Sequence, residues 1–179
     1  MVDINADGIL DIYVCNAGDS KGCQQNNELF INNGNLTFTE KAEEYNLADT
    51  GIITHAAFFD YDKDGDLDVY ILNNSFIPVS SLNYSNKREL RDKDWDVADI
   101  LKGGGDKLLR NDNGKFVDVS EAAGIYGSLI GFGLGVTVGD VNGDLFPDIY
   151  ISNDFYERDY LYINNKNGTF SEKIQDWTM

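Results

Sequence analysis

The sequence predicts an all-β fold made of three consecutive four-stranded blades of a β-propeller, the first of them incomplete. Three observations lead to this prediction. An acidic, glycine-bearing loop occurs three times, an apolar strand follows each copy, and a second strand then runs into an Asn/Gly turn. One repeat therefore reads strand, acidic loop, strand, strand, turn, strand. Four short antiparallel strands per unit describe a propeller blade.

The acidic loops run from Asp3 to Asp11, from Asp60 to Asp68 and from Asp140 to Asp148. Each carries carboxylate or amide side chains at alternate positions. Two carboxylates about 4 Å apart repel each other by several kcal/mol at an intermediate dielectric. A hard cation among the oxygens removes this repulsion, and Ca²⁺ takes six to eight oxygen ligands. We therefore predict about three Ca²⁺ sites, one per repeat.

In each loop, positions one, three and five are expected to supply side-chain oxygens, position seven a backbone carbonyl and position nine a carboxylate. Leu145 stands where the other loops have glycine at position six, which predicts strain and a weaker or differently shaped third site. The predicted ligands are Asp3, Asn5, Asp7, Ile9 and Asp11; Asp60, Asp62, Asp64, Asp66 and Asp68; and Asp140, Asn142, Asp144, Phe146 and Asp148.

The EF-hand is the main alternative for such loops, but it requires a bidentate Glu at position twelve and a helix on each side. Position twelve is Val14, Ile71 and Ile151, each in the middle of an expected strand. The EF-hand is therefore excluded for all three loops. An Asx-rich turn without a metal stays open as the simpler interpretation.

The strands after the loops, Asp11–Val14, Asp68–Ile71 and Asp148–Ile151, are apolar on both faces. This pattern is expected for strands packed between two neighbouring sheets. The strands that run into the Asn/Gly turns are expected to begin at Leu29, Leu108 and Leu161. The short strands after these turns carry Phe38, Phe116 and Phe170. The strands that enter the second and third acidic loops are expected at Ile52–Phe59 and Phe132–Gly139.

The repeats are assigned to residues 1–50, 51–127 and 128–179. The first two loops start 57 residues apart and the last two start 80 residues apart, which places an insertion at about 75–105. Within it, Ser85 to Leu101 is highly charged and is a candidate for a short helix. We interpret the insertion as a solvated surface loop, with a partner-binding loop as the alternative.

Three repeats do not close a ring, and the first lacks the strand that enters its loop. We therefore expect the chain to be an excerpt of a longer propeller, whose remaining blades pack against it. The formal charge of −17 argues against nucleic-acid binding. The sequence contains no run of about eighteen apolar residues, so no membrane span is predicted. No signal peptide is visible.

Other candidate chemistry is sparse. His55 is the only histidine and has no identifiable nucleophile or base beside it, so a structural role is favoured. Gly131 to Gly135 resembles a phosphate loop only superficially, because it lies in an expected strand where close backbone packing explains the glycines. Cys15 and Cys23 either form a disulfide or remain separate thiols, and both possibilities stay open.

The pattern D-x-[DN]-x-D-G-x-x-D followed by a D-[IV]-Y-[IV] strand resembles the FG-GAP/VCBS repeats, which form the seven-bladed propellers of integrin α subunits. The blocks Asn27–Gly34 and Lys107–Gly124 are similar to the cartilage acidic protein family. This resemblance covers essentially the whole chain. It implies a ring of about seven blades, Ca²⁺ in a structural role at the ligands named above, and an extracellular or cell-surface setting. Leu145, the insertion and the count of three repeats depart from the family pattern.

We expect a binding or adhesion scaffold without catalysis, whose protein or carbohydrate ligand the sequence does not identify. The alternative is a propeller-type enzyme or carbohydrate-active module with its active site at the ring mouth. His, Asp or Glu side chains that converge on a pocket outside the loops would favour the enzyme. A flat rim with exposed aromatic residues in the insertion would favour the binding scaffold.

Overall fold

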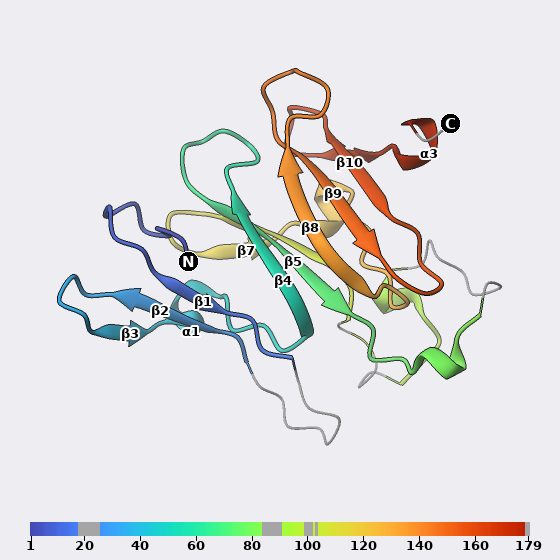
Figure 1. Cartoon of the computed structure of the whole chain (residues 1–179), viewed down its shortest axis with the longest axis horizontal. Coiled ribbons are helices and arrows are strands. Elements are labelled where there is room, and N and C mark those ends of the chain that lie inside the picture. The colour runs from blue at the N-terminus through green and yellow to red at the C-terminus, as the bar shows by residue number, and fades with distance from the viewer. Residues whose placement is uncertain (18–25, 84–90, 99–101, 103, 178–179) are drawn as a thin grey trace.

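A computed structural model of the chain describes residues 1–17, 26–83, 91–98, 102 and 104–177. Its strands form three antiparallel sheets that lie side by side along the long axis of the molecule (Figure 1). The sheets do not close into a ring. The all-β prediction with propeller-type blades is confirmed.

The first sheet, blade 1, has three strands in the order β1-β2-β3, and the other two sheets have four each. Blade 2 has the order β4-β5-β6-β7 and blade 3 the order β8-β9-β10-β11, so sequential strands are neighbours throughout. The strands are β1 (Ile12–Val14), β2 (Glu28–Asn32), β3 (Phe38–Glu40), β4 (Ile52–Phe59), β5 (Asp68–Asn74), β6 (Lys107–Asn111), β7 (Phe116–Asp118), β8 (Gly133–Gly139), β9 (Asp148–Asn153), β10 (Tyr160–Asn164) and β11 (Phe170–Glu172).

A four-residue helix follows the last strand of each blade, and the sequence analysis did not predict these helices. They are α1 (Ala42–Tyr45), α2 (Ser120–Ala123) and α3 (Ile174–Trp177). The first two end at Asn46 and Gly124, which adopt the left-handed conformation typical of a helix C-terminus. One turn is too short to show a helical period in the sequence, so no pattern marked them.

Two hydrophobic cores join the blades. Val69 and Ile71 of β5 belong to the core shared with blade 1, and Tyr70 and Leu72 belong to the core shared with blade 3. All four side chains are completely buried, as predicted for a strand between two sheets. The strands β1 and β9 differ because each contacts only one neighbouring blade: β1 is half-buried throughout, and Tyr150 of β9 is 37% exposed.

The insertion between β5 and β6 packs on a third, smaller core. Ile77 and Leu82 contact Leu129 and Ile130, with Trp95 packed against them. The described part of the insertion forms single 3₁₀ turns at Val79–Ser81 and Asp92–Asp94. The helix considered over Ser85 to Leu101 falls largely on residues 84–90 and 99–101, which lie outside the described residues. In the described part of the chain, no helix has the length and apolar character needed to cross a membrane.

Candidate metal centres

The three acidic loops occupy equivalent places in the blades. The middle loop joins β4 to β5, and the third joins β8 to β9. The first leads into β1 from Val2, which pairs with Asp11 in the same register as Phe59 with Asp68 and Gly139 with Asp148. All three loops therefore lie at the same end of their blades, along the upper edge of Figure 1.

The ninth-position carboxylates, those of Asp11, Asp68 and Asp148, are fully buried and hold each loop to a neighbouring strand. One oxygen of each accepts the backbone N–H of the second loop residue. The other oxygen accepts the N–H of the Asn that ends the next strand, so both carboxylate oxygens are satisfied. The two distances are 3.1 and 2.8 Å at Asp11, 3.0 and 2.9 Å at Asp68, and 2.9 and 2.8 Å at Asp148.

The partner residues, Asn32, Asn111 and Asn164, were missed as site residues by the sequence analysis. Each donates its side-chain amide to the carbonyl of the eighth loop residue, at 3.1 to 3.2 Å. Each side-chain oxygen also accepts a backbone N–H within the Asn/Gly turn. The available signal was their recurrence as the first residue of all three turns, which turn geometry alone does not require.

The fourth and sixth positions of every loop adopt a left-handed backbone. The φ angles are +56° and +86° at Ala6 and Gly8, +65° and +100° at Lys63 and Gly65, and +76° and +74° at Gly143 and Leu145. Leu145 thus takes the conformation that glycine takes in the other loops, at a cost of about 1–2 kcal/mol. The third loop therefore carries the expected backbone strain at its sixth position, Leu145. At its fourth position Gly143 adopts the left-handed conformation without strain.

The middle loop gathers three carboxylates around one point. Oxygens of Asp60, Asp62 and Asp68 all lie within 4.8 Å of one another. The Oδ1 atoms of Asp60, Asp62 and Asp66 are buried without a hydrogen-bond partner. The Asp64 carboxylate lies outside the group of three and accepts the Asp66 N–H at 3.1 Å. Buried, unpartnered carboxylate oxygens are costly, so this loop presents oxygens suited to a cation.

The same crowding changes the acidity of the middle loop. Burial raises the pKa of Asp68 to about 7, although the N–H bonds from Asn111 and Tyr61 act in the opposite direction. Burial, followed by the charge of Asp64, raises the pKa of Asp66 to about 6 and that of Asp62 above its usual value. A nearby divalent cation favours the ionised form and would lower all three pKa values.

The first and third loops are held together internally by an amide. Asn5 donates its side-chain N–H to Oδ2 of Asp7, and Asn142 donates to Oδ2 of Asp144, each at 3.0 Å. Asp144 also pairs with Lys166 at 3.2 Å. The pKa of Asp144 is lowered, first by the N–H of Phe146 and further by Lys166. Among the described residues, neither loop forms a group of three carboxylates like that of the middle loop.

The middle loop fits Ca²⁺ by its chemistry and spacing. Its donors are carboxylate oxygens, and an ion with ligands at about 2.3–2.6 Å places opposite ligand atoms about 4.6–5.2 Å apart. The oxygens of Asp60, Asp62 and Asp68 fall within that limit. The side chain of Asp64, the carbonyl of Asp66 and the ligands named for the first and third loops stay predictions.

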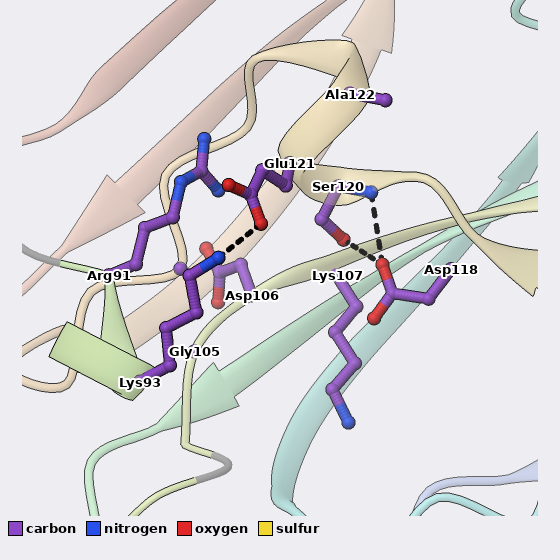
Figure 2. Close-up of a pocket in the computed structure, with 10 residues that line it drawn as sticks. Arg91, Lys93, Gly105, Asp106, Lys107, Asp118, Ser120, Glu121 and Ala122 are labelled. Carbon is purple, nitrogen blue, oxygen red and sulfur yellow. Dashed lines mark hydrogen bonds and ion pairs between the residues drawn. The ribbon is translucent and has the colours of Figure 1, made fainter.

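A groove of about 620 Å³ outside the loops lies beside the insertion (Figure 2). Figure 2 shows Lys93 and Glu121 facing each other across it, and the two form an ion pair at 2.5 Å. Asp118 accepts the N–H and the hydroxyl of Ser120, and Asp106 accepts the Tyr70 hydroxyl and the Asn73 N–H. Each carboxylate of this groove therefore has an identified structural partner.

The remaining candidates give no second centre in the described residues. His55 is exposed, and its Nδ1 accepts only a long bond of 3.5 Å from the Val136 N–H. Cys15 is half-buried. Cys23 lies outside the described residues, so the pairing of the two thiols stays a prediction. Gly133 packs its backbone against Leu72, in keeping with the close packing expected for this glycine-rich segment.

Comparison with known proteins finds a family match for the first two loops. A search of curated proteins finds no match. Residues 3–71 match the family model of the FG-GAP-like repeat. The matched stretch begins at the first residue of the first loop and ends at position twelve of the middle loop, so it contains one full repeat interval. The part of the chain from residue 3 to residue 71 is therefore an FG-GAP-like repeat segment.

Proposed function

We propose that this chain is a calcium-stabilised propeller segment that serves as an extracellular or cell-surface binding scaffold, without catalysis. The observation that carries the proposal is the set of buried, unpartnered oxygens in the middle loop, at Asp60, Asp62 and Asp66. Natural proteins leave few such atoms without a hydrogen bond or an ion. The extracellular setting and the adhesion role are supported by the family match and by the resemblance to integrin repeats.

The middle loop has a simple mechanical role in this proposal. Asp60, Asp62 and Asp68 would hold the ion, which supplies positive charge that cancels their mutual repulsion. Asp68 also accepts the N–H of Asn111 at the end of β6. A fixed Asp68 therefore connects the loop, β5 and β6, so cation binding adds directly to the stability of blade 2.

The alternative, an enzyme at the ring mouth, is supported less well. The groove in Figure 2 does bring Asp106, Asp118 and Glu121 together, but each is engaged by a structural partner. Asp106 moreover has counterparts in the other blades, Asn27 and Asp159, which make similar bonds to Tyr13 and Tyr150. A role that recurs in every blade favours architecture over catalysis.

Thermal unfolding in CaCl₂ and in chelator tests the calcium proposal. Extracellular calcium modules have dissociation constants of about 10⁻⁴–10⁻³ M, so 10 mM CaCl₂ is expected to stabilise the chain by about 1.4–2.7 kcal/mol. For a domain of this size that corresponds to a rise in Tm of roughly 3–11 °C. The double variant Asp60→Ala and Asp62→Ala should lose most of this rise.

Two controls isolate the effect. Glu43→Ala removes an exposed carboxylate of α1 outside the loops and should keep the full calcium response. MgCl₂ at the same concentration controls for ionic strength and should give a smaller shift, because Mg²⁺ is smaller and dehydrates reluctantly. Identical melting curves for the wild-type chain in CaCl₂ and in chelator would refute calcium stabilisation.

A further inference from the structure

The middle loop differs in charge from the other two at positions three and seven, and position three is the one whose side chain bonds the fifth-position carboxylate in the first and third loops. Position three is Asn5 in the first loop, Asp62 in the middle loop and Asn142 in the third. The backbone of the three loops is otherwise equivalent, with left-handed residues at positions four and six in each. The side chain at position three is therefore the natural place to look for a difference in metal dependence.

An asparagine at position three closes the loop from within. Its Nδ2 donates to the fifth-position carboxylate at 3.0 Å in both loops, and its Oδ1 accepts the N–H of the same Asp at 3.0 to 3.1 Å. That same N–H also donates to the first carboxylate, Asp3 or Asp140. Positions one, three and five are thus linked by hydrogen bonds that involve no ion.

An aspartate at position three has no N–H to donate. The Oδ1 atoms of Asp62 and Asp60 are buried without partners. The backbone N–H of Asp64 bonds the Asp62 carboxylate, but a carboxylate at position three cannot supply the second, side-chain link to position five. The middle loop also holds five carboxylates in nine residues, against three in each of the other loops. Its electrostatic repulsion is the largest, and its internal compensation is the smallest.

We propose that the third position sets the metal dependence of each loop. The middle loop, with Asp62, needs a divalent cation to hold its shape and is the tight site. The first and third loops are closed by the amides of Asn5 and Asn142, hold their shape without a cation and bind one more weakly. This inference rests on the calcium binding proposed above and adds an order of sites to it.

Exchanging the two side chains between the loops tests the inference. Asp62→Asn gives the middle loop the D-x-N-x-D-G pattern that the first loop already has. This variant should have a higher Tm than the wild type in chelator and a smaller rise in CaCl₂. Its tight site should weaken about tenfold or more in isothermal titration calorimetry, because affinity in such loops depends on the number of charged ligands.

The reciprocal variant carries Asn5→Asp and Asn142→Asp. It should have a lower Tm in chelator, a larger rise in CaCl₂, and more than the single tight site expected for the wild type. If this variant is unfolded in chelator, recovery of its far-UV circular dichroism on adding CaCl₂ gives the same answer. Recovery supports the inference, and failure to recover contradicts it.

The outcomes separate the inference from the proposal beneath it. A wild-type chain with no heat of binding and no shift in Tm overturns both. A normal wild-type response that Asp62→Asn leaves unchanged overturns the inference alone. So does an Asp62→Asn variant that is less stable than the wild type in chelator, since the amide bridge would then not replace the ion.

Discussion

Asp68 and its counterparts illustrate how one buried side chain connects local and distant parts of the chain. The carboxylate accepts one N–H from its own loop and another from Asn111, which lies 43 residues further along the sequence. The side-chain amide of Asn111 in turn donates to the Leu67 carbonyl. The pair forms a closed set of hydrogen bonds, and buried sets of this kind are costly to leave half-satisfied.

Asn164 offers the sharpest test of this Asp–Asn pairing at the residue scale. Its amide donates to the Pro147 carbonyl at 3.2 Å and to the Tyr61 carbonyl of the neighbouring blade at 2.9 Å. Asn164→Ala leaves these buried groups unpaired and is expected to lower the free energy of unfolding by about 1–3 kcal/mol, measured by urea denaturation.

The adjacent Asn165 is the matched control. It is exposed, its Nδ2 donates to the Thr169 hydroxyl at 3.0 Å, and its Oδ1 accepts the Ser171 hydroxyl at 3.0 Å, so both partners lie in its own hairpin. Asn165→Ala is expected to change the free energy of unfolding by no more than about 0.5 kcal/mol. Equal losses for the two variants would mean that the turn, not the bond to the acidic loop, accounts for the effect.

At the scale of the element, the strands after the middle and third loops are fastened at their far ends as well, because Asp106 and Asp159 accept the N–H groups of Asn73 in β5 and Asn153 in β9. The hydroxyls of Tyr70 and Tyr150 donate to Asp106 at 2.9 Å and to Asp159 at 2.6 Å. In blade 1 the arrangement is reversed, because Asn27 donates to the Tyr13 hydroxyl at 2.6 Å. A strand of six or seven residues that is held at both ends keeps a single register against its neighbours.

Asp106 makes the stability of blade 2 depend on pH. Asp106 is half-buried at the edge of the groove, but its carboxylate group is enclosed by protein. Burial raises the pKa of Asp106 from 3.8 to about 7, against the bonds from Asn73 and Tyr70, and Glu157 adds to the rise. The folded chain then holds this proton more tightly than the unfolded chain. Its contribution to stability is full below about pH 4 and is lost as the pH rises through 7.

Asp106→Asn introduces the residue that blade 1 already has at the equivalent position. The variant should gain stability relative to the wild type at pH 8 and gain little at pH 5, as measured by urea denaturation at both values. Asp159→Asn makes the equivalent change in blade 3 and controls for the effect of an amide at this place in a blade. A difference between wild type and Asp106→Asn that does not change with pH would contradict this role.

At the scale of the whole molecule, the arrangement of blades 2 and 3 depends on how closely their backbones approach each other. Thr54 of β4 donates its hydroxyl to the Gly133 carbonyl of β8 at 2.9 Å. A Cβ on Gly133 would lie 2.4 Å from side-chain carbons of the fully buried Leu72. Glycine at this position thus lets β8 of blade 3 pack directly on β5 of blade 2.

Gly133→Ala is expected to lower the free energy of unfolding by about 1–3 kcal/mol, because Leu72 must leave its preferred packing. Gly135→Ala, two residues along the same strand, meets only Ser152 Oγ at 3.5 Å and should change stability by no more than about 0.5 kcal/mol. Thermal unfolding of both variants checks the difference. A Gly133→Ala variant as stable as Gly135→Ala would show that the interface between the blades is loosely packed.

The repeated loops and strands could be predicted because they recur at fixed spacing, and recurrence is visible without any knowledge of contacts. The bond between Asp68 and Asn111 could not, since it joins residues 43 positions apart. The grouping of Asp60, Asp62 and Asp68, in contrast to the amide closure by Asn5, depends on side-chain orientation. A pattern of residue types treats aspartate and asparagine at that position as equivalent.

The two left-handed positions of the loops have an evolutionary consequence. Two loops keep glycine at the sixth position with Ala6 or Lys63 at the fourth, and the third loop keeps Gly143 at the fourth with Leu145 at the sixth. A lineage can pass from one arrangement to the other through an intermediate with glycine at both positions. At a left-handed position, each extra glycine removes about 1–2 kcal/mol of side-chain strain, which offsets its backbone-entropy cost of about 0.5–1 kcal/mol. Descendants of such loops are therefore better recognised by a glycine at either position than by the fixed D-G pair.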